Sequence, residues 1–499
     1  MVKKPEKTAA LDSELRDLTL VVILGSVMTI LDTTIVNVAI TPLGRDFGTS
    51  LPTIQWVLTG YTLALSMAIP VTGWAVQRFG AKSTWIGSLL IFITGSVLCG
   101  LAWNAGSLIA FRVLQGLGGG MIMPVGQTMV ARRAGPERMT RVMGMVAVPL
   151  MLGPVLGPVL GGLIVDDLTW RWMFFVNVPL CVLAIVFAVR ILPRDQGNAG
   201  ARLDAAGLAL LSPGLAVMIY GLSKAGDDNA QLAIWLPVGA GLVAAFAVRA
   251  LRTATPLVSI RALARRAFGS SATAMFVYTG AMFGFMVVLP VYFQVVRGQS
   301  ALRAGLLMAP IGLGAMITMA LSGRLTERVP PRWIVIAGMV LVAAGAVVFT
   351  QIQVGTSLAL LAAALFVAGL GHGAILPPAM GSSYQGMPAP EIPTATATFN
   401  VIIRVGSSFG TAVLAVVLQQ AIRSRIPGAS GSLSGTAGLH GASALAALTA
   451  AFGSSFWWVA VIALAAILPA LLIPGGPAPA PSVPDGLAAA EAPPSAMTE

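Results

Sequence analysis

Asp32 is the residue whose type and position best suit chemistry, because it is an acid inside a long apolar run. Of the 18 acidic residues, it alone lies well inside such a run. An ionisable group within a membrane-spanning segment is costly and is a functional hypothesis by default. A medium of low dielectric constant favours the neutral form of a carboxyl group, so we expect Asp32 to carry a proton. Arg112, at a similar expected depth in another apolar run, is the candidate partner; helix capping or packing is the alternative for both residues.

Two further ionisable residues, Arg404 and His372, lie in apolar runs nearer the C-terminus. Arg404 either contacts a substrate or binds backbone carbonyls beside Gly406 and Gly410, and the sequence leaves both roles open. His372 lies in a glycine-rich stretch, which favours neutral packing over titration. The sequence contains no pattern of metal ligands, catalytic groups or a phosphate-binding loop, so we expect neither an enzyme nor a metal or cofactor site.

Composition favours a membrane protein over a soluble one. Hydrophobic residues make up 57% of the chain and charged residues 10%, and the mean hydropathy is +0.87. Soluble domains carry about 25% charged residues. The formal net charge of +12 lies in short segments between apolar runs, which argues against a nucleic-acid partner. Cys99 and Cys181 both lie in apolar stretches, so a disulfide framework is not expected.

Fourteen apolar runs approach the length of a membrane helix, which needs about 20 mostly apolar residues. They lie near residues 18–40, 54–76, 83–103, 106–128, 141–165, 172–192, 203–222, 232–250, 268–295, 304–323, 333–351, 357–380, 394–420 and 454–474. With the N-terminus placed inside, 21 of the 30 Lys and Arg residues fall in inner loops. Because basic residues concentrate on the cytoplasmic side, we expect both termini in the cytoplasm.

Segments about 250 residues apart resemble each other, as in transporters built from repeated halves. The matching pairs are 73–78 with 323–328, 116–124 with 369–377, and Gly153 and Gly157 with Gly406 and Gly410. Asp32 and Arg112 have no charged counterparts, so the charges are not duplicated. The repeat predicts an all-α membrane fold of two six-helix bundles with two helices inserted between them. The predicted parts are a cytoplasmic segment 1–17, bundles 18–192 and 268–474, inserted helices 203–250, and a disordered tail 475–499.

A run of glycines and prolines marks the fifth predicted helix, namely Gly153, Pro154, Gly157, Pro158, Gly161 and Gly162. Glycines four residues apart form a flat face for close helix packing. Prolines bend a helix because they lack an N–H donor. We interpret this run as a hinge and seal between two moving bundles. Generic membrane packing would explain the glycines but not the doubled Gly-Pro.

Together these motifs resemble the fourteen-helix drug:proton antiporter branch of the major facilitator superfamily, over nearly the whole chain. The first-helix signature of that branch matches 31–39, including Thr33, Thr34 and Asn37. The fourth-helix motif matches Arg112, Gln115 and Gly116, and the motif that opens the sixth helix matches Trp170 to Pro179. The loop motif after the second helix matches Gly73, Gln77, Arg78 and Gly80, and its second copy Gly323, Glu327 and Arg328. Gln77 departs from the family pattern, which has an acid at that position.

The resemblance implies multidrug or antibiotic resistance by proton-driven export of a small amphipathic or cationic toxic compound. It implies a bacterial inner membrane, no cofactor and a monomer. Asp32 would bind the proton, Arg112 would tune its release, the fifth-helix motif would keep the exchange obligatory, and the two loops would gate it. The alternatives are a dedicated exporter of an endogenous metabolite, antibiotic or lipid, and a non-transporting membrane receptor or scaffold.

The substrate is expected near the midplane, between the two halves. The residues predicted to contact it are Arg404, Trp56, Tyr61, Tyr278, Phe283 and Met286. Lipid-facing packing is the alternative for the apolar members of this set.

Overall fold

The computed structural model describes residues 13–150, 153–193, 195, 197–225, 228–253, 255–426 and 442–475, and these contain helices but no β-strand. The N-terminal group comprises α1 (Ser13–Asp46), α2 (Leu51–Ala68), α3 (Val71–Phe79), α4 (Ala81–Gly100), α5 (Ala105–Leu150), α6 (Gly153–Asp167), α7 (Trp172–Phe175) and α8 (Asn177–Ile191). The next two helices are α9 (Ala205–Ser223) and α10 (Asn229–Arg252). The C-terminal group comprises η1 (Ile260–Ala264), α11 (Arg266–Val295), α12 (Ala301–Thr326), α13 (Pro331–Thr350), α14 (Leu358–Ser383), η2 (Ala389–Glu391), α15 (Ile392–Arg425), α16 (Ala442–Ala465) and α17 (Ile467–Ala470).

In the described part, twelve helices are long and apolar enough to cross a membrane, or thirteen if the bent pair α2 and α3 is one span. The pair bends by 54° at a break that contains Pro70, which has no N–H to continue the helix. The predicted span 141–165 falls on the end of α5 and on α6, which has 15 residues; residues 151 and 152 lie outside the description. A many-spanning helical fold is therefore confirmed. The number fourteen is compatible with it and stays a prediction.

The glycine contacts follow the sequence repeat. In α5, Gly116 packs on the backbone of α2 and Gly118 on that of α4. In α14, Gly369 packs on the backbone of α12 and Gly371 on that of α13. The fourth long helix of each group therefore packs on its neighbours through equivalent glycines, because a residue without a side chain allows close approach. Likewise α6 packs on α1, and α15 packs on α11.

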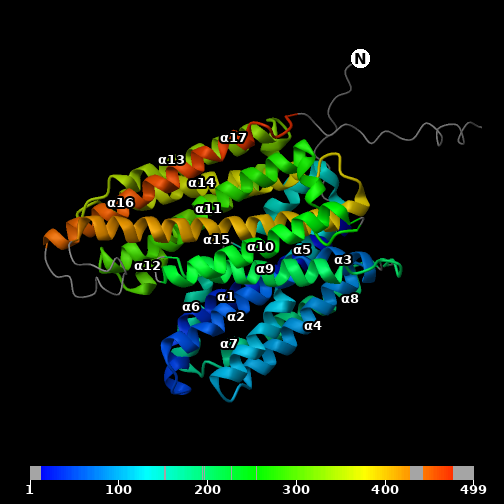
Figure 1. Cartoon of the computed structure of the whole chain (residues 1–499), viewed down its shortest axis with the longest axis horizontal. Helices are drawn as coiled ribbons and strands as arrows, with labels where there is room; N and C mark the ends of the chain where they lie inside the picture. The colour runs from blue at the N-terminus through cyan, green and yellow to red at the C-terminus, as the bar shows by residue number, and fades with distance from the viewer. Residues whose placement is uncertain are drawn as a thin grey trace, which may run out of the picture.

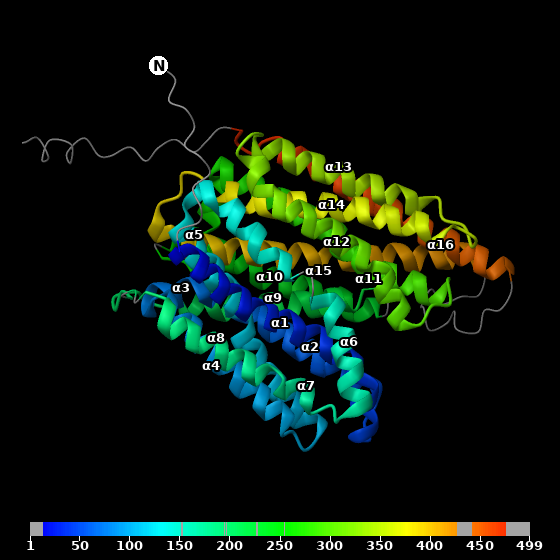
Figure 2. The ribbon, with the colours of Figure 1, turned by 180° about the vertical axis from the view of Figure 1, so that it is seen from behind.

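The two groups touch near one end of the molecule. We call this the basic end; α1 begins there, and it carries Lys82, Arg132, Arg141, Arg249 and Arg324. At this end Gly144 of α5 packs on Met319 of α12, and Gly73 of α3 packs on Thr394 of α15. From here the helices of the two groups diverge toward the opposite end (Figures 1 and 2).

Helices α9 and α10 pack on each other, and α9 contacts both α2 and α15 (Figure 1). The Ser212 hydroxyl of α9 donates a 2.8 Å hydrogen bond to the Met67 carbonyl of α2. The pair thus lies along the boundary between the N-terminal and C-terminal groups. The domain boundaries given above stay predictions, and residues 1–12 and 476–499 lie outside the described part.

Candidate functional site

Asp32 of α1 is fully buried, and its carboxylate accepts hydrogen bonds from two other helices. Arg112 Nη1 of α5 lies 2.7 Å from Oδ2, while Gln115 Nε2 of α5 and Asn177 Nδ2 of α8 each lie 2.9 Å from Oδ1. Ser96 Oγ of α4 accepts from Gln115 at 3.2 Å and from Asn177 at 3.0 Å. The network therefore joins α1, α4, α5 and α8, and the predicted pairing of Asp32 with Arg112 is present as a buried ion pair.

Arg112 is held on several sides. Its Nη1 also donates to Gln115 Oε1 at 2.7 Å, and its Nε donates to the Val57 carbonyl of α2 at 3.3 Å. The guanidinium carbon lies 3.9 Å from the centre of the Tyr61 ring and 5.8 Å from that of Phe174. Contact with an aromatic face stabilises a cation in a site from which water is excluded. The site therefore holds a charge pair that is fixed in place and sealed from solvent in this conformation.

Asn177, Ser96 and Gln115 are site residues to which the sequence reasoning assigned no role. Asn177 lies in the motif between Trp170 and Pro179, and Gln115 lies in the fourth-helix motif beside Arg112. Both could have been found as amides within recognised motifs. Ser96 is a single hydroxyl in an apolar run, and only the packing of α4 against α8 brings it to the network. Among the described residues, no group of three or more His, Cys, Asp or Glu side chains could hold a metal ion.

The first-helix signature and the fifth-helix motif lie against each other. Thr34 Oγ1 of α1 contacts the Gly153 carbonyl of α6 at 3.2 Å and also donates within α1, to the Ile30 and Leu31 carbonyls at 3.0 Å. Gly157 packs directly on Thr34, so that a Cβ atom there would overlap the Thr34 hydroxyl. Asp32 lies two residues before Thr34, so α6 is coupled to the helix that carries the acid.

The remaining residues of the first-helix signature are Thr33 and Asn37, and those of the fifth-helix motif are Pro154, Pro158, Gly161 and Gly162. Thr33 Oγ1 donates within α1 to the Thr29 carbonyl at 2.9 Å. Gly161 is buried, whereas a Cβ atom on Gly162 would meet no heavy atom within 4 Å. The backbone of Pro154 and Pro158 lies in α6, but their side chains, like that of Asn37, lie outside the description. The structure therefore brings together Thr34, Gly153 and Gly157, and a hinge action of α6 stays a prediction.

Gly157→Val is expected to loosen the packing of α6 on α1. The added β-branched side chain has few rotamers and would collide with Thr34, and overpacking of this kind costs about 1–3 kcal/mol. The midpoint of thermal unfolding in detergent should therefore fall. Gly162→Val is the matched control, because its site on the same helix has open space. Equal midpoints for both variants would show that the contact with Thr34 is not constrained.

The first loop motif, from Gly73 to Gly80, lies at the basic end and connects α3 to α4. Gly80 has φ of +84°, and a Cβ atom on it would lie 2.7 Å from an Asp195 oxygen, so only glycine fits. Asp195 accepts from the backbone N–H groups of Ala81 and Lys82 at 2.5 and 3.2 Å. It thereby satisfies N–H groups that have no partner within α4. Asp195, which the sequence reasoning missed, supplies an acid to a motif that lacks one at Gln77.

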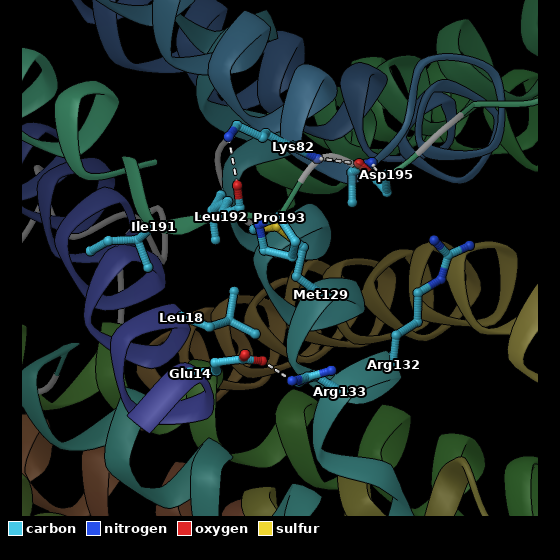
Figure 3. Close-up of a pocket in the computed structure, with 11 residues that line it drawn as sticks. Glu14, Leu18, Lys82, Met129, Arg132, Arg133, Ile191, Leu192, Pro193 and Asp195 are labelled. Carbon is cyan, nitrogen blue, oxygen red and sulfur yellow. Dashed lines mark hydrogen bonds and ion pairs between the residues drawn. The ribbon is translucent and has the colours of Figure 1, made fainter. Parts of the chain in front are cut away.

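Figure 3 shows this region around a cavity of about 320 Å³. The Lys82 ammonium donates to the Leu192 carbonyl at 2.5 Å, and Glu14 forms an ion pair with Arg133 beside Leu18 (Figure 3). Since Lys82 also binds the Val189 carbonyl at 2.8 Å, it caps the end of α8. The α3–α4 loop is therefore anchored to α8 through both Lys82 and Asp195.

The two loop motifs meet the opposite group in different ways. Gln77 Nε2 donates to Thr394 Oγ1 at 3.1 Å, which links α3 to the first turn of α15. In the second copy, Gly323 of α12 packs on Arg141 of α5, whereas Glu327 and Arg328 are exposed. Arg78 is half-buried. Both motifs therefore lie at the contact between the groups, as a gate requires, and the gating role itself stays a prediction.

Three of the predicted substrate contacts, Tyr61, Tyr278 and Trp56, pack against other protein groups in this conformation, and their substrate role stays a prediction. The Tyr61 side chain is 1% exposed and lies beneath Arg112, and Tyr278 is fully buried, with its hydroxyl 2.5 Å from His372 Nδ1. A side chain so enclosed cannot touch a ligand without rearrangement. Trp56 stacks on Tyr220 of α9, with ring centres 5.6 Å apart, so it packs against the inserted pair. Phe283 is 45% exposed, and Met286 is half-buried against the hydrophobic core.

Arg404 of α15 reaches across the boundary between the groups. Its Nε donates to Ser66 Oγ of α2 at 3.1 Å, a partner that the sequence reasoning did not name. One turn away on α15, Asn400 Nδ2 donates to Gln127 Oε1 of α5 at 2.7 Å. A polar strip of α15 therefore faces the N-terminal group, and Arg404 lies on it.

Comparison with known proteins gives the same architecture. The sequence profile of the Major Facilitator Superfamily matches residues 22–411. The chain is 40% identical over 405 residues to a multidrug resistance protein B homolog of Mycobacterium tuberculosis, covering 80% of this chain and 75% of that protein. It is 29% identical over 409 residues to the multidrug export protein EmrB of Haemophilus influenzae, covering 79% of each. The solved proton:xylose symporter XylE has the same fold at 15% identity, with a TM-score of 0.61 over 91% of this chain and 95% of that one. The chain therefore belongs to the Major Facilitator Superfamily and is a multi-pass membrane transporter of small molecules.

Proposed function

We propose that this transporter exports small amphipathic or cationic toxic compounds from a bacterial cell in exchange for protons, and so confers multidrug resistance. The observation that carries the proposal is the fully buried pair of Asp32 and Arg112 inside a membrane-spanning bundle. Two relatives of this chain are named as a multidrug resistance protein homolog and a multidrug export protein. Their names support toxic small molecules as the exported class. The proton gradient drives export without a cofactor, and the monomer is the working unit.

The exchange begins at Asp32. The carboxylate accepts three hydrogen bonds, one of them from the Arg112 cation. A proton on Asp32 removes the negative charge and weakens its bond to Arg112, because charge-assisted hydrogen bonds are the stronger ones. Helix α1 is then freed to shift, and α6 shifts with it through the contact of Thr34 with Gly153 and Gly157. Binding and release of the proton thereby change how α1 and α6 pack.

The orientation follows from the charges. Basic residues favour the cytoplasmic side of a bilayer, so the basic end faces the cytoplasm and both termini lie there. The groups touch at that end and diverge at the other (Figures 1 and 2). The described conformation is thus the one closed to the cytoplasm, in which a proton enters and cargo leaves on the outer side. Gln77, Thr394, Gly144 and Gly323 form the closed gate.

Energised inside-out membrane vesicles test the proposal. The protein should let a panel of amphipathic amines and quaternary ammonium dyes collapse a preformed pH gradient, because each compound enters the lumen in exchange for protons. Vesicles without the protein are the control, and the gradient is followed with a fluorescent pH probe. If none of the panel collapses the gradient, export of drugs by proton exchange is excluded. A response to one endogenous metabolite alone would favour the dedicated exporter.

A further inference from the structure

Among the described residues, the buried site offers no free carboxylate to a cation. Asp32 is 0% exposed, and Arg112, Gln115 and Asn177 occupy its carboxylate. Asp32 and Arg112 also cancel each other's charge. Among the described residues of the candidate membrane spans, the remaining charge far from a span end is Arg404, which lies about 18 Å along α15 from Ile392.

Arg404 is poorly satisfied for a guanidinium group. The bond from Nε to Ser66 uses one of its five N–H donors. None of the ion pairs among the described residues includes Arg404, and its side chain is half-buried rather than enclosed. A cation within a membrane span is costly unless it is paired. A serine hydroxyl carries no charge and cannot serve as the counter-ion.

The position of Arg404 suits a substrate site that opens and closes as the two helix groups move. It lies on α15 of the C-terminal group and touches α2 of the N-terminal group, so its contact breaks when the groups move apart. The fork of N–H groups at Nη1 and Nη2 matches the two oxygens of a carboxylate or sulfonate. We propose that Arg404 binds the anionic oxygens of lipophilic substrates, so that organic anions are among the exported compounds. This inference rests on the proposed export function and adds a second substrate class to it.

Under this proposal, the net charge moved in each transport cycle depends on the charge of the substrate. Exchange of one inward proton for one outward monocation moves no net charge. Exchange of one inward proton for one outward monoanion moves two positive charges inward. Since the cell interior is negative, the membrane potential then drives export of the anion directly. Export of an anion must therefore respond to the membrane potential even without a pH gradient.

Binding by purified protein in lipid nanodiscs is the first test. The probes share a ring system and carry fixed charges: 2-naphthalenesulfonate, neutral 2-naphthalenesulfonamide and (2-naphthyl)trimethylammonium. We expect the sulfonate to bind the wild type about tenfold more tightly than the sulfonamide, as a charge-assisted hydrogen bond predicts. Arg404→Gln should remove this preference, and Arg404→Lys should keep most of it. Ser66→Ala is the matched control; it removes the structural partner of Arg404 and should keep the preference.

Three binding results would overturn the proposal: equal affinities for sulfonate and sulfonamide, a preserved preference in Arg404→Gln, or its loss in Ser66→Ala. The last would mean that Arg404 only ties α15 to α2. In inside-out vesicles, a lumen-positive potassium diffusion potential at equal pH should speed sulfonate uptake several-fold and leave trimethylammonium uptake unchanged. Proton-coupled transport without sulfonate preference refutes only this inference. Sulfonate preference at Arg404 without proton-coupled transport refutes only the proposed function.

Discussion

Replacing Asp32 with Asn is expected to abolish the collapse of the pH gradient by cargo, down to the rate of vesicles without the protein. Asn resembles the protonated acid in shape and charge, so it can accept from Gln115 and Asn177 but cannot take up or release a proton. A carrier locked in the neutral form of this site can still exchange cargo for cargo. Downhill exchange of labelled for unlabelled cargo should therefore survive within a few-fold of the wild-type rate.

Asp17→Asn is the control for this experiment, because Asp17 lies on the same helix with its side chain 38% exposed. It should transport as the wild type does. The amount of protein in the membrane and its thermal midpoint must be measured for both variants, so that loss of protein is not mistaken for loss of coupling. If Asp32→Asn collapses the gradient as fast as the wild type, the proton binds elsewhere and the assignment of Asp32 is wrong.

Replacing Arg112 with Leu is expected to lower the free energy of unfolding more than Gly157→Val does. It leaves the Asp32 carboxylate buried without its cation, and breaking a buried pair from one side costs about 3–5 kcal/mol. It also removes the contact with the Tyr61 ring. The thermal midpoint in detergent should fall well below that of Arg16→Leu, a change at a side chain that is 66% exposed.

The double variant Asp32→Asn/Arg112→Leu separates charge from packing. It removes both charges, so no unpaired ion remains in the interior. We expect it to be more stable than Arg112→Leu alone, and the coupling between the two positions is read from the double-mutant cycle. Additive losses in the two single variants would mean that the ion pair contributes little beyond packing.

The sequence alone predicted the helical architecture and named Arg112 as the candidate partner of Asp32, and the structure shows the two as an ion pair. Charged residues are costly in apolar helices, so few are present and each is easily recognised in the sequence. Such residues usually pair with one another. Because of the same cost, each spanning helix can be recognised as an apolar run. The glycine repeat reflects close helix packing at equivalent positions of the two groups. These features are encoded locally or by a repeated spacing, so they can be read without coordinates.

Only the tertiary structure determined which neighbours each face of a helix contacts. Tyr61 and Trp56 lie on the same helix, yet one lies beneath Arg112 and the other packs on the inserted pair. Ser66 meets Arg404 across 338 residues of sequence, and Asp195 reaches the α4 N-terminus across 114. Such contacts depend on the rotation and tilt of helices within a bundle. Hydropathy does not determine either quantity, because apolar residues occur all round a membrane helix, on faces that meet lipid and on faces that meet protein. Asp32 could therefore be identified from the sequence, whereas Ser96 was linked to its network only by the packing of α4 against α8.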